Sequence, residues 1–231
     1  MDFAPFDTRG YPVLPVELGY TEWAPTYDAT VHDELDLDLL ARVSSVPWSK
    51  VLSAVDLACG TGRIGAWLKR RGVGAVEGVD TSTAMLDRAR DKSVYDALHR
   101  ADIRATGLTA GAFQLATCIL AECHLEDLQT LYTETARLLA AGGVFVLVGY
   151  HPHFLFKGIP THFDRADGTS AAVANHIHLL SDHAKAALAM GFELLEIDER
   201  VFDDDWIAKR PRFACYRDEP VSFCLAWRKR D

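Results

Sequence analysis

The chain has 231 residues, of which 49% are hydrophobic and 25% charged, and its formal net charge is −9. This balance is typical of a globular protein with one domain and additional segments, or with two small domains. The acidic charge disfavours nucleic acid as a partner, and no apolar run approaches the length of a membrane span.

Predicted strands and helices alternate from about residue 31 onward. Apolar runs predict strands over residues 51–58, 75–79, 98–101, 113–120, 144–148, 192–197 and 221–227. Helical spacing predicts helices over residues 35–43, 64–68, 82–90, 125–139 and 179–190, the fourth ended by Gly142 and Gly143. This alternation predicts an α/β fold with a doubly wound sheet, in which ligands bind beyond the carboxyl ends of the strands.

The cysteines indicate the compartment. The chain has five, an odd number, and none forms a CxxC pair. This pattern predicts reduced thiols and a cytoplasmic location. The first ten residues also lack the basic start and apolar core of a signal peptide.

A glycine-containing loop follows the first predicted strand of the domain, in the sequence DLACGTG. Gly60 and Gly62 allow the backbone to approach a ligand closely, and the helix that follows presents free N–H groups. Together with Gly65 they satisfy G-x-G-x-x-G, a weak signal for a dinucleotide site. An NAD(P)-binding oxidoreductase is therefore one alternative.

Acidic residues near the ends of three strands favour a different ligand. Asp56 lies where a pyrophosphate would be repelled, but where an ammonium group would be attracted. Asp80 follows the second strand, where a carboxylate can accept from both ribose hydroxyls. Asp102 follows the third strand and can accept from an exocyclic amine. S-adenosylmethionine carries all three groups.

Three segments resemble the successive cofactor motifs of the class I S-adenosylmethionine-dependent methyltransferases: VDLACGTGR, GVDTSTAML and ADI. The resemblance runs from about Tyr20 to Tyr150. It implies a Rossmann-like seven-stranded sheet of order 3-2-1-4-5-7-6 with the last strand antiparallel, and S-adenosylhomocysteine as the product. It also implies that the cofactor contacts Tyr27, Asp56, Ala58, Cys59, Gly60, Gly62, Asp80, Thr81, Met85, Asp102, Ile103 and Leu120.

The sequence departs from the family pattern at two positions. Ala58 stands where the first motif often has glycine, and a methyl group is small enough for binding to survive. Gln114 stands where the fourth strand often has an acid, so any role of that acid is absent or neutral here.

Three segments outside the core repeat are expected to meet at one rim and form the substrate pocket. They are the N-terminal lid, residues 1–30, and two insertions into the single domain 31–231, at residues 151–178 and 201–220. Expected substrate-binding residues are Tyr20, His124, Tyr150 and Trp206. His124 can also cap the following helix, and Trp206 can simply pack its hairpin.

Histidines are concentrated in the first insertion. His151 directly follows a strand, and His153 points to the same side in extended backbone, so these two are the candidate catalytic bases. The alternative is that these imidazoles only hold the lid together. No metal is expected, because His176, His178 and His183 do not share a helix face.

The sequence thus predicts a cytoplasmic enzyme that methylates O or N, with C as a further acceptor atom, of a small ring-bearing metabolite. Neither nucleic acid nor membrane is an expected partner, and a homodimer is compatible with the sequence. The alternatives are a protein or RNA methyltransferase, the oxidoreductase, and a non-catalytic S-adenosylmethionine-binding relative.

Overall fold

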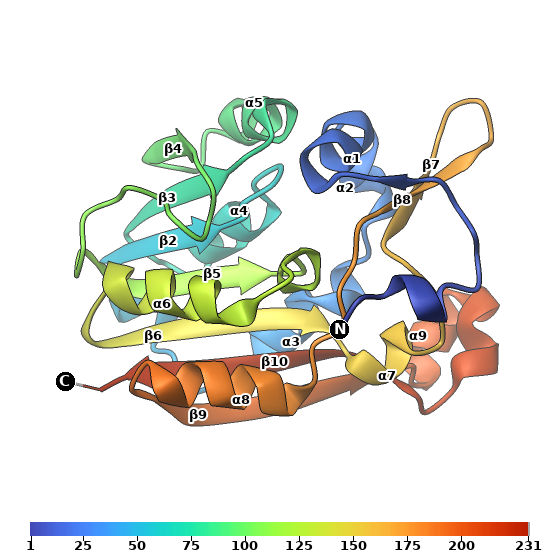
Figure 1. The fold of residues 1–231 in the computed structure, drawn as a ribbon. Coiled ribbons are helices and arrows are strands. Elements are labelled where there is room, and N and C mark those ends of the chain that lie inside the picture. Colours follow the sequence, from blue (N-terminus) through green and yellow to red (C-terminus); the bar gives the residue numbers. More distant parts are fainter. Residues whose placement is uncertain (231) are drawn as a thin grey trace.

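The computed structural model describes residues 1–230, and its centre is a seven-stranded sheet (Figure 1). The spatial order is β4-β3-β2-β5-β6-β10-β9, and β10 runs antiparallel to both neighbours. Counted along the chain, this is the predicted order 3-2-1-4-5-7-6 with an antiparallel last strand, which is confirmed. The strands are β2 (Ser53–Leu57), β3 (Ala75–Asp80), β4 (Ala97–Arg100), β5 (Phe113–Ile119), β6 (Leu139–Tyr150), β9 (Phe192–Val201) and β10 (Pro220–Lys229).

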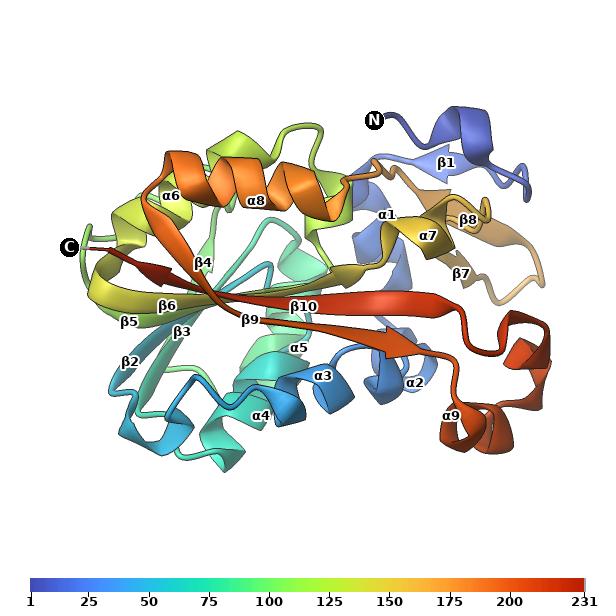
Figure 2. The same ribbon diagram turned by 90° about the horizontal axis from the view of Figure 1, so that it is seen from below.

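Helices cover both faces of this sheet (Figure 2). One face carries α3 (Leu37–Arg42), α4 (Arg63–Arg70) and α5 (Thr83–Lys92), and the other carries α6 (Leu128–Leu138) and α8 (Leu180–Ala189). Two hydrophobic clusters result, one around Trp67 and Leu68 and one around Leu131 and Tyr132. Burial of these apolar side chains, worth roughly 25 cal/mol per Å², fixes the sheet and therefore the loops at its carboxyl edge.

The helix predicted over residues 125–139 is shorter than expected. It ends at Leu138, and β6 begins at Leu139 and runs through Gly142 and Gly143. The prediction that these glycines end the helix was wrong. Leu139 already pairs with Phe113, and the register shifts before Leu115 pairs with Val144. Gly142 has φ +71°, a conformation that accommodates this irregularity.

A second sheet of three strands joins the N-terminal segment to the first insertion. Its order is β1 (Val13–Leu14), β8 (Ser170–Val173) and β7 (His162–Asp164), and β1 runs parallel to β8. Short helices complete the rim: α1 (Val16–Trp23), α2 (Tyr27–Thr30), α7 (Pro152–Leu155) and α9 (Asp204–Lys209), with 3-10 turns η1 (Ala4–Phe6), η2 (Asp33–Leu35), η4 (Glu122–His124) and η5 (Pro211–Tyr216). Figure 1 shows α1, α2, α7, α9 and the second sheet beyond the carboxyl ends of β2, β5 and β6. Another 3-10 turn, η3 (Trp48–Lys50), precedes β2 at the opposite edge. Within residues 1–230, no helix combines the length and apolarity needed to span a membrane.

Candidate active site

A cavity of about 260 Å³ lies at the carboxyl ends of the parallel strands. The loops after β2, β3, β4 and β5 each contribute side chains or backbone to its wall, and α1 and α2 cover it. The lining residues are Val16, Glu17, Tyr20, Tyr27, Ala58, Gly60, Asp80, Thr81, Ser82, Met85, Asp102, Ile103, Arg104, Ile119, Leu120, Ala121, His124 and Leu125.

Two glycines, one in the loop after β2 and one in the helix that follows it, are needed for different reasons. Gly60 has φ +52°, and a Cβ there would meet no atom within 4 Å, so its bare backbone borders open space. Its N–H donates to Asp80 Oδ2 at 2.9 Å. Gly65 lies in the following helix, where a Cβ would overlap the Tyr95 ring. The third glycine of G-x-G-x-x-G is thus explained by packing against Tyr95, without a dinucleotide.

Asp56 lies beneath this loop, only 1% exposed. Tyr95 Oη donates to its Oδ2 and Thr117 Oγ1 to its Oδ1, both at 2.7 Å. Burial raises the pKa of this carboxyl to about 6, although the two hydrogen bonds act to lower it. Asp56 does not line the cavity, so the direct contact predicted between it and an ammonium group is absent from this geometry. Its position supports the loop instead.

Asp80 and Asp102 do line the cavity, in contrasting surroundings. Both oxygens of Asp80 already accept from backbone, one from Gly60 and the other from the Ser82 N–H at 2.8 Å. Burial raises the pKa of Asp80, and these bonds oppose the shift. Asp102 is paired with Arg104 at 2.6 Å, and the hydrogen bonds from Arg104 lower the pKa of Asp102.

Tyr20 and His124 form a pair at the wall of this cavity. His124 Nδ1 is 2.7 Å from the Ala174 carbonyl oxygen, to which it must donate. Nε2 is therefore the acceptor, and the Tyr20 hydroxyl donates to it at 2.7 Å. Burial lowers the pKa of His124 to about 4, so the imidazole is neutral near pH 7. The pair orients the Tyr20 hydroxyl and is not a base with a pKa near neutrality.

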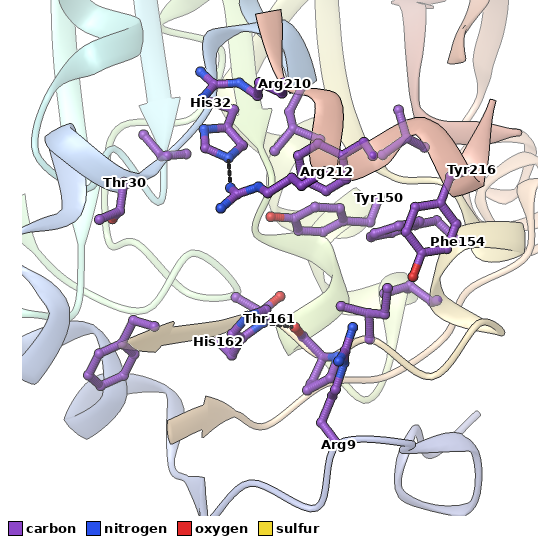
Figure 3. Close-up of a pocket in the computed structure, with 18 of the residues that line it drawn as sticks. Arg9, Thr30, His32, Tyr150, Phe154, Thr161, His162, Arg210, Arg212 and Tyr216 are labelled. Carbon is purple, nitrogen blue, oxygen red and sulfur yellow. Dashed lines mark hydrogen bonds between the residues drawn. The ribbon is translucent and has the colours of Figure 1, made fainter. Parts of the chain in front are cut away.

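A second, larger cavity of about 790 Å³ lies beside the first, and Figure 3 shows its wall. The N-terminal segment, the first insertion and residues 202–221 all contribute to it. Tyr150 and Trp206 line this cavity, whereas Tyr20 and His124 line the smaller one. The four predicted substrate residues are therefore divided between two neighbouring cavities.

Aromatic side chains of α1 and α2 separate the two cavities. Tyr20 stacks on Trp23 with ring centroids 5.8 Å apart, and Trp23 meets Tyr27 edge to face at 4.9 Å. Tyr20 and Tyr27 face the smaller cavity, and Trp23 faces the larger one. The Trp23 indole N–H donates to Thr30 Oγ1 at 2.8 Å, which fixes the ring.

Comparison with known proteins identifies the fold and a methyltransferase domain. Residues 55–147 match a methyltransferase domain family. A malonyl-acyl-carrier-protein O-methyltransferase of Enterobacter lignolyticus is 34% identical over 125 residues, 52% of this chain and 47% of that protein. A demethylmenaquinone methyltransferase of Thermus thermophilus is 32% identical over 142 residues, 58% of this chain and 64% of that protein. The chain thus spans about half to two thirds of the length of these curated relatives.

A solved structure extends the similarity to most of the chain. The S-adenosylmethionine-dependent methyltransferase of Mesorhizobium loti superposes with a TM-score of 0.69 at 26% identity, covering 85% of this chain and 98% of that one. Residues 55–147 are therefore a methyltransferase domain, and the chain shares its fold with an enzyme that depends on S-adenosylmethionine.

The structure gathers most of the predicted methyltransferase cofactor residues around the smaller cavity. Cys59 and Gly62, like Asp56, do not line it. The predicted residues that do line it are Tyr27, Ala58, Gly60, Asp80, Thr81, Met85, Asp102, Ile103 and Leu120.

The two candidate catalytic histidines are not at either cavity. His151 begins α7 and its Nε2 lies 3.0 Å from Glu199 on β9, while His153 lies 3.3 Å from Glu219. His151 follows β6 as expected, but its backbone N–H bonds to the Val221 carbonyl and its ring turns toward β9 and β10. The expectation that His151 lies near the transferred methyl group does not agree with this placement.

Sequence reasoning missed several residues of the larger cavity. Arg9, His32 and Arg212 line it, yet none lies in a recognised motif. The basic run at residues 209–212 was the only signal for Arg212, and it did not indicate which way the side chain turns. No local pattern marks Arg9.

Proposed function

We propose that this chain transfers the methyl group of S-adenosylmethionine to O or N, with C as a further acceptor atom, of a small ring-bearing metabolite. One observation carries the proposal. The cavity built by the predicted cofactor residues adjoins a larger cavity of about 790 Å³, across the wall of Tyr20, Trp23 and Tyr27. The larger volume is within the range of small-molecule sites.

The residues of the smaller cavity fit the cofactor. The bare backbone at Gly60 allows close approach, and lone pairs of Asp80 are positioned to accept from ribose hydroxyls. Met85, Ile103 and Leu120 offer an apolar surface for a planar base. When bound, S-adenosylmethionine supplies a methyl group on a cationic sulfur, which becomes the neutral thioether of S-adenosylhomocysteine after transfer.

The lid residues of this chain would hold the cofactor and exclude water. Thr61 Oγ1 donates to Asp28, and Lys92 Nζ bonds to Asp28 at 2.6 Å and to the Thr61 carbonyl at 2.7 Å. Arg63 pairs with the buried Asp36 at 3.0 Å. These bonds join α2 and η2 to the glycine loop, and so position Tyr27 over the cavity. Holding both reactants in fixed positions lowers the activation free energy of a displacement reaction by several kcal/mol.

Titration calorimetry with S-adenosylmethionine tests cofactor binding. We expect saturable binding to the wild-type protein and at least about tenfold weaker binding to Asp80→Ala, as for the loss of 1.4 kcal/mol. Asp91→Ala, an exposed position on α5, is the matched control. Thermal unfolding without ligand shows whether each variant folds. Absence of binding, or equal binding by folded Asp80→Ala, contradicts the proposal.

The alternatives predict different results. An NAD(P)-binding oxidoreductase would quench nicotinamide fluorescence. A non-catalytic relative would bind S-adenosylmethionine but consume no labelled methyl donor with any metabolite extract. A protein or RNA methyltransferase would label polymer and not metabolite. A cytoplasmic location and a homodimer remain predictions, and sedimentation checks the second.

A further inference from the structure

The larger cavity has an unusual charge for this chain, and this bears on the substrate class of the proposed methyl transfer. The chain carries 33 acidic and 24 basic residues. Around this cavity the balance is reversed, because among residues 1–230 three arginines and only one carboxylate line it. That carboxylate, Asp164, accepts from Ser170 Oγ at 2.6 Å. The charged residues are Arg9, Asp164, Arg210 and Arg212.

Resting on the proposed function, we propose that the methyl acceptor carries an anionic group, a carboxylate, sulfonate or phosphate, which Arg9 and Arg212 bind. The rest of that acceptor is an aromatic or other flat apolar body, which the aromatic wall of the cavity covers.

Arg212 has a neutral partner. Its Nη2 lies 2.9 Å from His32 Nε2, and because a guanidinium can only donate, Nε2 accepts and the imidazole is uncharged (Figure 3). Burial, together with the charges of Arg210 and Arg212, lowers the pKa of His32. A neutral imidazole orients the guanidinium without compensating its charge. The remaining N–H groups of Arg212 are free to bind a planar anion in two-point contact.

Arg9 faces the cavity from the opposite side. Figure 3 shows its side chain rising from the N-terminal segment toward Thr161 and His162. Within residues 1–230, no carboxylate lies within 4 Å of the charged nitrogens of Arg9 or of Arg212. Two cations without a carboxylate partner in the lining of one cavity make that cavity attractive to an anion.

Arg210 provides the contrast. It lines the same cavity, but Glu34 Oε2 lies 3.3 Å from its Nη2. Its charge is therefore matched within the protein. Arg210 is accordingly a suitable control for the loss of one positive charge from this wall.

The wall between the arginines is aromatic. Phe154 and Phe202 are buried with centroids 5.7 Å apart, and Tyr216 meets Phe202 at 5.7 Å. Arg212 itself lies over the Phe213 ring at 4.9 Å. Aromatic walls favour flat apolar bodies through stacked and edge-to-face contacts.

Two fluorescent probes that differ by one charged group test the proposal. We would titrate 8-anilinonaphthalene-1-sulfonate and its uncharged analogue N-phenyl-1-naphthylamine into the wild-type protein, the Arg9→Gln/Arg212→Gln double variant and Arg210→Gln. Thermal unfolding confirms that each variant is folded. We expect the double variant to bind the sulfonate at least tenfold more weakly, equivalent to about 1.4 kcal/mol. Its affinity for the uncharged probe, and the affinity of Arg210→Gln for both probes, should change less than threefold.

The proposal is overturned if the double variant loses less than tenfold in affinity for the sulfonate, or if it loses affinity for both probes equally. It is also overturned if Arg210→Gln weakens sulfonate binding as much as the double variant does. Displacement of the bound sulfonate by 1-naphthoate and by 1-naphthyl phosphate then shows which anion is preferred, and equal displacement by 1-naphthalenemethanol overturns the need for charge. S-adenosylmethionine binding is measured separately on the same proteins. If the cofactor binds and the probes show no charge preference, this inference fails alone. If the cofactor does not bind, the proposed function fails.

Discussion

Glu122 provides a sharp test of the energetics of this fold, because its carboxyl group is almost fully buried. It lies in η4 at the end of β5 and is 2% exposed. Its Oε2 has no hydrogen-bond partner within residues 1–230. Burial raises the pKa of its carboxyl to about 8, although backbone N–H groups of residues 121–123 and of Tyr150 oppose the shift.

The raised pKa predicts a loss of stability as the pH rises. An unfolded glutamate titrates near 4.5, so between that pH and 8 the folded chain binds more protons than the unfolded one. The contribution of Glu122 to stability is therefore fully present below the unfolded pKa and is lost as the pH rises through the folded pKa. From these two pKa values, the free energy of unfolding falls by about 1 kcal/mol between pH 7 and pH 8 because of Glu122.

The assay is urea unfolding at pH 7.0, 7.5 and 8.0 for wild type, Glu122→Gln and Glu126→Gln, an exposed neighbour in the same loop. Asp56, with a pKa of about 6, and His124, with one of about 4, titrate below this window. Glutamine is neutral at every pH, so Glu122→Gln should lack the loss, and Glu126→Gln should follow wild type. Parallel pH profiles for wild type and Glu122→Gln would refute the reasoning.

Three further predictions concern the glycine loop, the β6 terminus and the lid. Gly65→Ala must displace Tyr95, so unfolding in urea should show a loss of about 1–3 kcal/mol, and an unchanged midpoint would contradict the packing argument. A Cβ at Gly149 would overlap Glu122, so Gly149→Ala should lower the free energy of unfolding by a similar amount. Adding Glu122→Ala to this variant should recover part of the lost stability. If the effects of the two substitutions on the free energy of unfolding simply add, the contact is contradicted. Asp28→Asn removes the ion pair to Lys92 and weakens the lid. Stopped-flow measurement should therefore show S-adenosylmethionine dissociating a few times faster, as for the loss of about 1 kcal/mol or less. An unchanged dissociation rate would mean that this ion pair does not hold the lid closed.

The sequence by itself indicated which segments form the strands, and its resemblance to a known family implied their order and the cofactor edge of the sheet. Apolar runs identify strands because a sheet covered on both faces must bury both sets of side chains, as at residues 144–148 of β6. Asp80 and Asp102 could be placed at the cavity because Asp80 ends β3 and Asp102 lies just after β4, where the chain has little freedom to turn elsewhere. The spacing of residues along the chain is enough to place a side chain when the strand next to it fixes the position of its backbone.

Only the tertiary structure decided which way several side chains point. Asp56 lies near the carboxyl end of its strand as predicted, but the direction of its side chain depends on Thr117 and Tyr95, which lie on other elements. His151 follows β6, yet Glu199 on a distant strand sets the direction of its ring. These partners lie far apart along the chain, so no local pattern reports them.

The larger cavity shows the same limit most clearly. Arg9 and Arg212 lie near opposite ends of the sequence and reach the same cavity because β1 pairs with β8 and because β10 returns beside β6. Their uncompensated charge is a property of the assembled wall. Such a property depends on which carboxylates lie within a few ångströms in space, and a sequence specifies that only through the complete fold.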